Sequence, residues 1–146
     1  MTAPTSNTFS ATTSIIIQAK IEKVWDALTN PEIVRQYLFG TEVTTDWQVG
    51  SPITYKGVWK DTPYEDKGVI VAFIPNQLLQ TSYWSAFSER EDAPENYILV
   101  SYRLSEADDG TMLSITTDKN PSEEDAENGS KNWGYVLQMM KDLLEK

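Results

Sequence analysis

The C-terminal stretch of the chain has the most regular pattern of apolar and polar residues. Between residues 130 and 146, apolar side chains recur at steps of three and four, with polar ones between them. The apolar positions are Trp133, Val136, Leu137, Met140, Leu143 and Leu144. This spacing predicts a helix with one apolar face, about 25 Å long at a rise of about 1.5 Å per residue.

The start of this helix is less evident from the pattern. Ser122, three residues before Asp125, resembles a capping box that could begin a helix. Asn128-Gly129 then interrupts helical preference. We therefore expect a continuous helix only from about Ser130, preceded by a frayed acidic lead-in at residues 122–129.

Two short helices are predicted near the N-terminus. Apolar residues repeat with helical period from about residue 20 to residue 29, and the residue before Pro31 disfavours a helical backbone, which ends this helix. Pro31 can itself begin a second short helix, Glu32 to Tyr37. Ahead of them, residues 9–18 are rich in Thr and Ile and predict a first strand. Residues 1–8 are small and polar and predict a flexible tail.

From Thr41 the period changes to two, which predicts strands. Six are expected, separated by turns rich in Pro, Gly, Asn and Asp, and residues 87–95 read as an acidic hairpin loop. The strands cover residues 42–47, 53–59, 65–74, 78–86, 97–104 and a last one that follows Asp108-Asp109-Gly110 and stops at Asn120-Pro121. Sequential strands with short links pair antiparallel, so we expect one curved seven-stranded antiparallel sheet, covered on one face by the final helix. A strongly twisted sheet leaves a cavity or groove beside that helix.

Composition narrows the possible functions. A chain of 146 residues fits one domain, here residues 9–146, and it has no Cys and no His. The commonest zinc and iron ligands and the usual catalytic nucleophile and base pairs are therefore missing, and we expect no metal and no cofactor. The net charge of −10 disfavours nucleic acid and anionic membranes as partners. The start lacks the features of a signal peptide, and we expect a cytoplasmic protein.

Several segments together resemble a known superfamily. They are the run IEKVWDALTNPE from Ile21 to Glu32, Gly68-Val69 ahead of Pro75, Tyr83-Trp84, Gly110-Thr111 with Leu113, and Trp133 followed by Leu137 and Leu143. In order and spacing, residues 15–144 resemble the SRPBCC, or START-like helix-grip, superfamily. Within it they are most similar to the branch related to the activator of the heat-shock-protein-90 ATPase. The resemblance implies an α+β helix-grip fold, in which a sheet wraps a long C-terminal helix with an apolar cavity between them.

Members of this superfamily bind lipids, hormones, polyketides or aromatic compounds. Some catalyse cyclisation or hydration, and others act as co-chaperones. In the second short helix a Trp-Phe or Trp-Trp pair is common among them, whereas this chain has Tyr37-Leu38-Phe39.

Large aromatic and apolar side chains are the candidate ligand-binding residues. Tyr and Trp combine apolar bodies with polar groups, and could stack on a flat ligand and orient it, or could simply fill the core. The candidates are Trp25, Tyr37, Phe39, Tyr55, Trp59, Tyr83, Tyr102, Trp133, Leu137 and Met140. A catalytic site would need an acid or base in the cavity, yet the candidates on strands are expected to face solvent. These are Asp46, Lys56, Glu65, Lys67, Arg103 and Asp118.

Three functions stay open. The first is binding of a small hydrophobic or aromatic molecule between the sheet and the last helix. The second is a co-chaperone-like, stress-related interaction with a chaperone, and the third is an enzyme of the cyclase or hydratase kind. The missing His makes catalysis the less expected outcome, and a buried carboxylate facing a tyrosine in a deep cavity would favour it. The chain is expected to be a monomer or a homodimer.

Overall fold

The computed structural model describes residues 9–86 and 90–145, without the side chain of Trp59. The predicted tail at residues 1–8 and part of the predicted acidic loop lie outside the described residues. The elements are β1 (Phe9–Ile17), α1 (Ile21–Thr29), α2 (Pro31–Tyr37), β2 (Glu42–Thr44), β3 (Pro52–Trp59), β4 (Thr62–Ile74), β5 (Leu78–Tyr83), a short 3-10 helix (Pro94–Asn96), β6 (Ile98–Ala107), β7 (Gly110–Asn120) and α3 (Glu123–Leu144).

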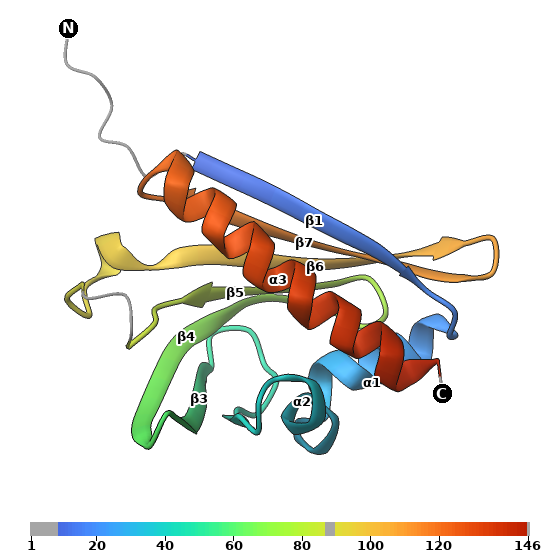
Figure 1. The fold of residues 1–146 in the computed structure, drawn as a ribbon, viewed down its shortest axis with the longest axis horizontal. Helices are drawn as coiled ribbons and strands as arrows, with labels where there is room; N and C mark the ends of the chain where they lie inside the picture. The colour runs from blue at the N-terminus through green and yellow to red at the C-terminus, as the bar shows by residue number, and fades with distance from the viewer. Residues whose placement is uncertain (1–8, 87–89, 146) are drawn as a thin grey trace, which may run out of the picture.

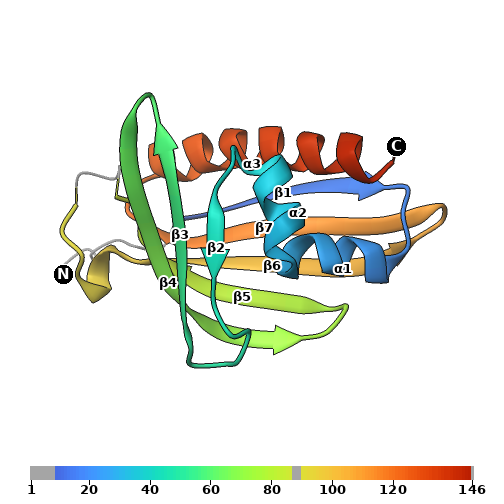
Figure 2. The ribbon, with the colours of Figure 1, turned by 90° about the horizontal axis from the view of Figure 1, so that it is seen from below.

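The seven strands form one antiparallel sheet in the order β1-β7-β6-β5-β4-β3-β2. Successive strands from β2 to β7 are neighbours, and β1 crosses to pair with β7 at the far edge. Figure 1 shows α3 lying across β1, β7 and β6, with α1 and α2 near its C-terminal end. In Figure 2, β3 and β4 lie at a steep angle to β6 and β7, because the sheet is strongly twisted and curves toward the helices. The α+β helix-grip fold that the sequence predicts, with its two short helices between the first two strands, is confirmed.

The prediction for the start of the last helix was wrong by seven residues. The α3 helix begins at Glu123, and the Ser122 hydroxyl accepts a hydrogen bond of 3.0 Å from the Asp125 N–H, as an N-cap does. The helix continues through Gly129, and the hydroxyls of Ser130 and Thr13 lie 2.6 Å apart, joining it to β1. Packing on the sheet therefore outweighs the low helical preference of Asn128-Gly129.

Some strand ends also differ from the predictions. Strand β2 stops at Thr44, three residues early, and β5 stops at Tyr83 rather than at 86. The turn into β4 consists of Lys60 and Asp61, both with positive φ, so β4 begins at Thr62. Gly68, within β4, lies so close to β5 that a Cβ there would stand 1.8 Å from the Ser82 carbonyl oxygen. Only glycine allows this close approach.

The core lies between the concave face of the sheet and the helices. Alternate residues of each strand point inward, as the period of two predicts, and meet the apolar face of α3. The most deeply buried large side chains are Ile17, Ile53, Ile70, Leu113, Ile115, Leu137 and Met140. On the convex face, Thr12 pairs with Thr116 and Ser14 with Ser114 through their hydroxyls, at 2.9 and 2.8 Å. None of the helices in the described part of the chain is long and apolar enough to cross a membrane.

Candidate functional site

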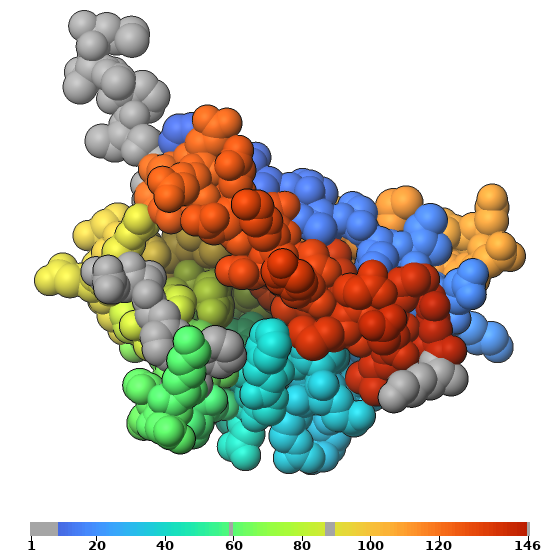
Figure 3. Space-filling view, in the orientation of Figure 1, coloured from blue at the N-terminus to red at the C-terminus, as the bar shows by residue number. Residues whose placement is uncertain are grey.

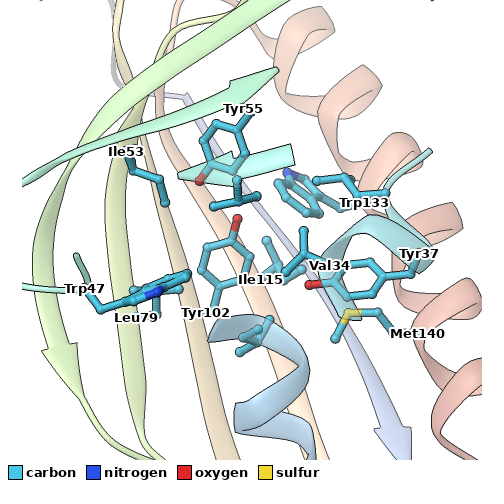
Figure 4. Close-up of a pocket in the computed structure, with 13 residues that line it drawn as sticks. Val34, Tyr37, Trp47, Ile53, Tyr55, Leu79, Tyr102, Ile115, Trp133 and Met140 are labelled. Carbon is cyan, nitrogen blue, oxygen red and sulfur yellow. The ribbon is translucent and has the colours of Figure 1, made fainter. Parts of the chain in front are cut away.

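An apolar pocket lies where the concave face of the sheet meets α2 and α3 (Figure 4). Its thirteen lining residues are Leu28, Val34, Tyr37, Leu38, Val43, Trp47, Ile53, Tyr55, Leu79, Tyr102, Ile115, Trp133 and Met140. None of these side chains is charged. The cavity has a volume of about 30 Å³, enough for one or two water molecules and far below the roughly 300 Å³ of typical small-molecule sites.

The pocket brings together five of the ten predicted ligand-binding residues. Tyr37 comes from α2, Tyr55 from β3, Tyr102 from β6, and Trp133 and Met140 from α3. The rings of Tyr102 and Trp133 stand edge to face, with centroids 5.6 Å apart and an angle of 89° between their planes. The wall on this side is therefore built by aromatic groups from both the sheet and the last helix.

Four of the other five predicted residues do not line this pocket. Trp25 is buried, but its ring packs edge to face on Phe73 at 5.3 Å, and Leu137 is a core residue. Phe39 is 61% exposed, because it follows α2 in a turn where its own φ is 54°. Tyr83 is half-buried, and its ring stands edge to face with that of Tyr55, with centroids 5.7 Å apart. The side chain of Trp59, the fifth of these residues, lies outside the described residues.

Trp47 is a lining residue that the sequence analysis missed. It follows the short strand β2 with a φ of 61°, and its ring centroid lies 6.3 Å from that of Phe73. The left-handed backbone conformation of Trp47 interrupts the alternation of inward and outward side chains that would have continued in a longer strand. Its only signal in the sequence was its size and its place at the end of an alternating segment.

Asp66 is the second residue that the sequence analysis missed. Its side chain is buried, with one oxygen accepting a hydrogen bond from the Tyr83 hydroxyl at 2.6 Å and the other from the Ala86 N–H at 2.8 Å. It lies opposite Tyr55 in the β3–β4 register. Asp66 stands two and four residues before Gly68 and Ile70, which both face inward on β4. This alternation was the signal in the sequence that could have identified Asp66 as an inward-facing residue.

The charged residues considered as catalytic candidates lie elsewhere. Asp46, Lys56, Glu65 and Arg103 are exposed, and Asp118 is half-buried outside the pocket. Lys67 forms an ion pair with Asp92 at the surface. Asp66 does face a tyrosine, but both groups are already hydrogen-bonded and neither lines the cavity. Among the described residues, no set of three or more Asp or Glu side chains could hold a metal ion.

Four tyrosines, of which Tyr37 and Tyr102 are buried and Tyr55 and Tyr83 half-buried, give the site its chemical character. Burial raises the pKa of Tyr37, Tyr83 and Tyr102 well above the ordinary value, and raises that of Tyr55 to about 12. The nearby Asp66 carboxylate adds to the shift at Tyr83. All four hydroxyls are therefore protonated at neutral pH and can donate hydrogen bonds. The arrangement can hold an apolar ring and a polar group, but it offers no free acid or base.

A sheet wrapped around a C-terminal helix, with a pocket between them, defines a START-like helix-grip protein. Residues 18–145 match the family described as activator of Hsp90 ATPase homolog 1-like protein, and the chain belongs to that family. A comparison with curated proteins found no match.

Solved structures share this fold. The solution structure of ChR145 from Cytophaga hutchinsonii is 42% identical, with a TM-score of 0.80 and 94% of each chain covered. The Aha1 dimer from Colwellia psychrerythraea is 20% identical, with a TM-score of 0.72, covering 94% of this chain and 96% of that one. CalU16 from Micromonospora echinospora is 24% identical, with a TM-score of 0.71, covering 90% of this chain and 73% of that one. At these identities, the last two structures support the fold alone.

Proposed function

We propose that this protein binds a small, neutral, hydrophobic or aromatic molecule in the pocket between the sheet, α2 and α3. The observation that carries the proposal is the composition of the pocket lining. Its thirteen described residues come from both the sheet and the helices, and all of them are apolar or aromatic, without a charged side chain. Tyr55, Tyr102 and Trp133 supply ring faces and edges for stacking. An apolar molecule is better accommodated by such a wall than a charged one, which would lose its hydration without compensation.

Binding requires the pocket to open, because its present volume holds only water-sized molecules. The wall best able to move comprises α2 and β2. The helix has seven residues, and β2 is an edge strand of three residues that pairs only with β3. Between them Phe39 and Gly40 have positive φ. In the space-filling view, the surface is hollowed between α3 and the β3–β4 hairpin (Figure 3), beside this wall.

The test combines thermal stability with methionine NMR. A library of neutral aromatic compounds should contain members that raise Tm, since a ligand at one hundred times its Kd stabilises the folded state by about 2.7 kcal/mol. In protein labelled at the methionine methyl carbon, these compounds should shift the signal of Met140, which lines the pocket. The matched control is Met112, which is 36% exposed and lies on the convex face. A library that leaves both Tm and the Met140 signal unchanged contradicts the proposal, as does a shift confined to Met112.

A co-chaperone-like role is the second candidate function. It is favoured by the family description, and by exposed apolar side chains at Phe39, Val49, Val58 and Tyr135, which are 61% to 70% exposed. Exposed apolar residues that lie together in one patch are typical contact points for a protein partner. If this role holds, the protein should stimulate the ATPase of purified Hsp90, and Phe39→Ala should weaken the stimulation more than Met112→Ala. An ATPase rate that does not change on addition of the protein contradicts it.

A further inference from the structure

Two of the four tyrosines donate their hydroxyl hydrogens to groups outside the pocket, whereas the hydroxyl of Tyr55 interacts with that of Thr81. Tyr37 donates to the Ala27 carbonyl oxygen at 2.9 Å, and Tyr83 donates to Asp66. The hydroxyl of Tyr102 points toward Tyr55 across the pocket (Figure 4), and it makes no hydrogen bond with any residue that the structure describes. The pocket therefore contains hydroxyl groups that the folded chain leaves available.

Thr81 places a further hydroxyl close to the pocket, although it is not one of the residues that line it. It is 1% exposed, and its Oγ1 atom makes no hydrogen bond within the described chain. In β5 it shares the concave face with Leu79, which lines the pocket, and it lies between Ile70 and Val100 of the neighbouring strands. Its hydroxyl lies near that of Tyr55, and their weak interaction, too poorly aligned to count as a hydrogen bond, opposes only in part the rise that burial causes in the pKa of Tyr55. A buried hydroxyl without a partner costs about 1–3 kcal/mol, and native proteins keep few of them.

We propose that the hydroxyls of Tyr55, Thr81 and Tyr102 form a polar end of this pocket that holds one carbonyl oxygen of an otherwise apolar, neutral ligand. This inference rests on the proposed binding function and names the class of ligand. A carbonyl oxygen has two lone pairs and can accept from two converging hydroxyls at once. These hydroxyls stay protonated at neutral pH, so each remains a donor.

The charges near this end of the pocket argue against an ionised ligand. A carboxylate would approach Asp66, which lies across the β3–β4 register from Tyr55, and the pocket lining offers no Lys or Arg to balance it. A cation would need Asp66 as its partner, but that carboxylate is buried outside the pocket lining and accepts hydrogen bonds from Tyr83 and Ala86. The neutral carbonyl is the group that these donors fit.

The experiment compares matched probes by calorimetry. The ketone 1-tetralone and the hydrocarbon tetralin have nearly the same shape, and 1-naphthoate adds a charge. We expect the unmodified protein to bind 1-tetralone about fivefold or more tightly than tetralin, as one net hydrogen bond provides, and to bind 1-naphthoate weakest. Tyr102→Phe and Thr81→Val should each reduce this preference, and Tyr135→Phe, at a site 70% exposed, should leave it unchanged. The infrared carbonyl stretch of bound 1-tetralone should lie at lower frequency in the unmodified protein than in Tyr102→Phe.

The outcomes separate the two proposals. Equal affinity for 1-tetralone and tetralin would overturn the polar end while leaving the binding function in place. The same conclusion follows if the preference survives in both variants, or if the carbonyl stretch does not differ between the unmodified protein and Tyr102→Phe. Binding of none of the three probes would overturn both proposals. Thr81→Val replaces an unpaired hydroxyl by a methyl group, so it should fold with a Tm at or above that of the unmodified protein, and Tyr102→Phe provides an independent variant.

Discussion

The free energy of unfolding should fall by about 5 kcal/mol when the pH is raised from 9 to 11. The cause is a group of four tyrosines, Tyr37, Tyr55, Tyr83 and Tyr102, whose pKa values are all raised, chiefly because their hydroxyls are withdrawn from water. In the unfolded chain they would ionise near pH 10, as ordinary tyrosines do. In the folded protein they stay protonated to higher pH.

The sign follows from where the protons are bound. A group whose pKa is raised by folding stabilises the folded state fully below its unfolded pKa, and this stability is lost as pH rises toward the folded pKa. At pH 11 each such tyrosine lowers the free energy of unfolding by about 1.4 kcal/mol, so four of them account for the expected fall. Since small domains are stable by about 5–15 kcal/mol, the protein should approach unfolding at that pH.

Urea titrations at pH 9 and pH 11, followed by far-ultraviolet circular dichroism, measure this effect. The matched variant is Tyr102→Phe, which removes one buried tyrosine, so its loss between the two pH values should be smaller by about 1.4 kcal/mol. Tyr135→Phe, at a position 70% exposed, should behave like the unmodified protein. Equal unfolding midpoints at pH 9 and pH 11 would show that the tyrosines are reached by solvent in the folded state.

The fold could be predicted because its signals are local and repeated. Alternation along β6 and β7 and the apolar stripe of α3 each fix a face, and sequential strands then pair antiparallel. What the sequence lacked was tertiary information. The cap at Ser122 was recognisable in the sequence, but the contact between Ser130 and Thr13 of β1, which joins this part of the helix to the sheet, is not revealed by local propensity.

The pocket was harder to predict than the fold. Alternation shows which residues share a face, but the volume left between them depends on how closely the helices pack, and here about 30 Å³ remains. Trp47 enters the wall through a left-handed backbone conformation. Asp66 is buried, with hydrogen bonds from Tyr83 and Ala86 at the end of β5, a contact between strands that local alternation does not show. Phe39, a close sequence neighbour of Tyr37, points away because the chain turns after α2.

Met140→Ala should destabilise the protein by about 2–5 kcal/mol, the usual cost of removing a large buried side chain. Met140 is 1% exposed, lies on the apolar face of α3 and lines the pocket. Its removal takes away contacts with the sheet and with the wall formed by α2, and leaves a void that the surrounding core fills only in part. Urea unfolding of the two proteins measures the difference. Met112→Ala is the matched control and should change stability by less than about 0.5 kcal/mol, since Met112 lies on the outer face.

The same substitution also tests whether space alone limits the site. An apolar void of benzene size stays dry and binds benzene, so benzene should raise the Tm of Met140→Ala and leave that of Met112→Ala unchanged. A loss of stability below about 1 kcal/mol, without benzene binding, would mean that α2 and β2 collapse onto the site when Met140 is shortened. A small loss of stability without benzene binding would show that α2 and β2 can move inward. A void that persists and binds benzene would mean that opening the pocket requires only an outward displacement of α2.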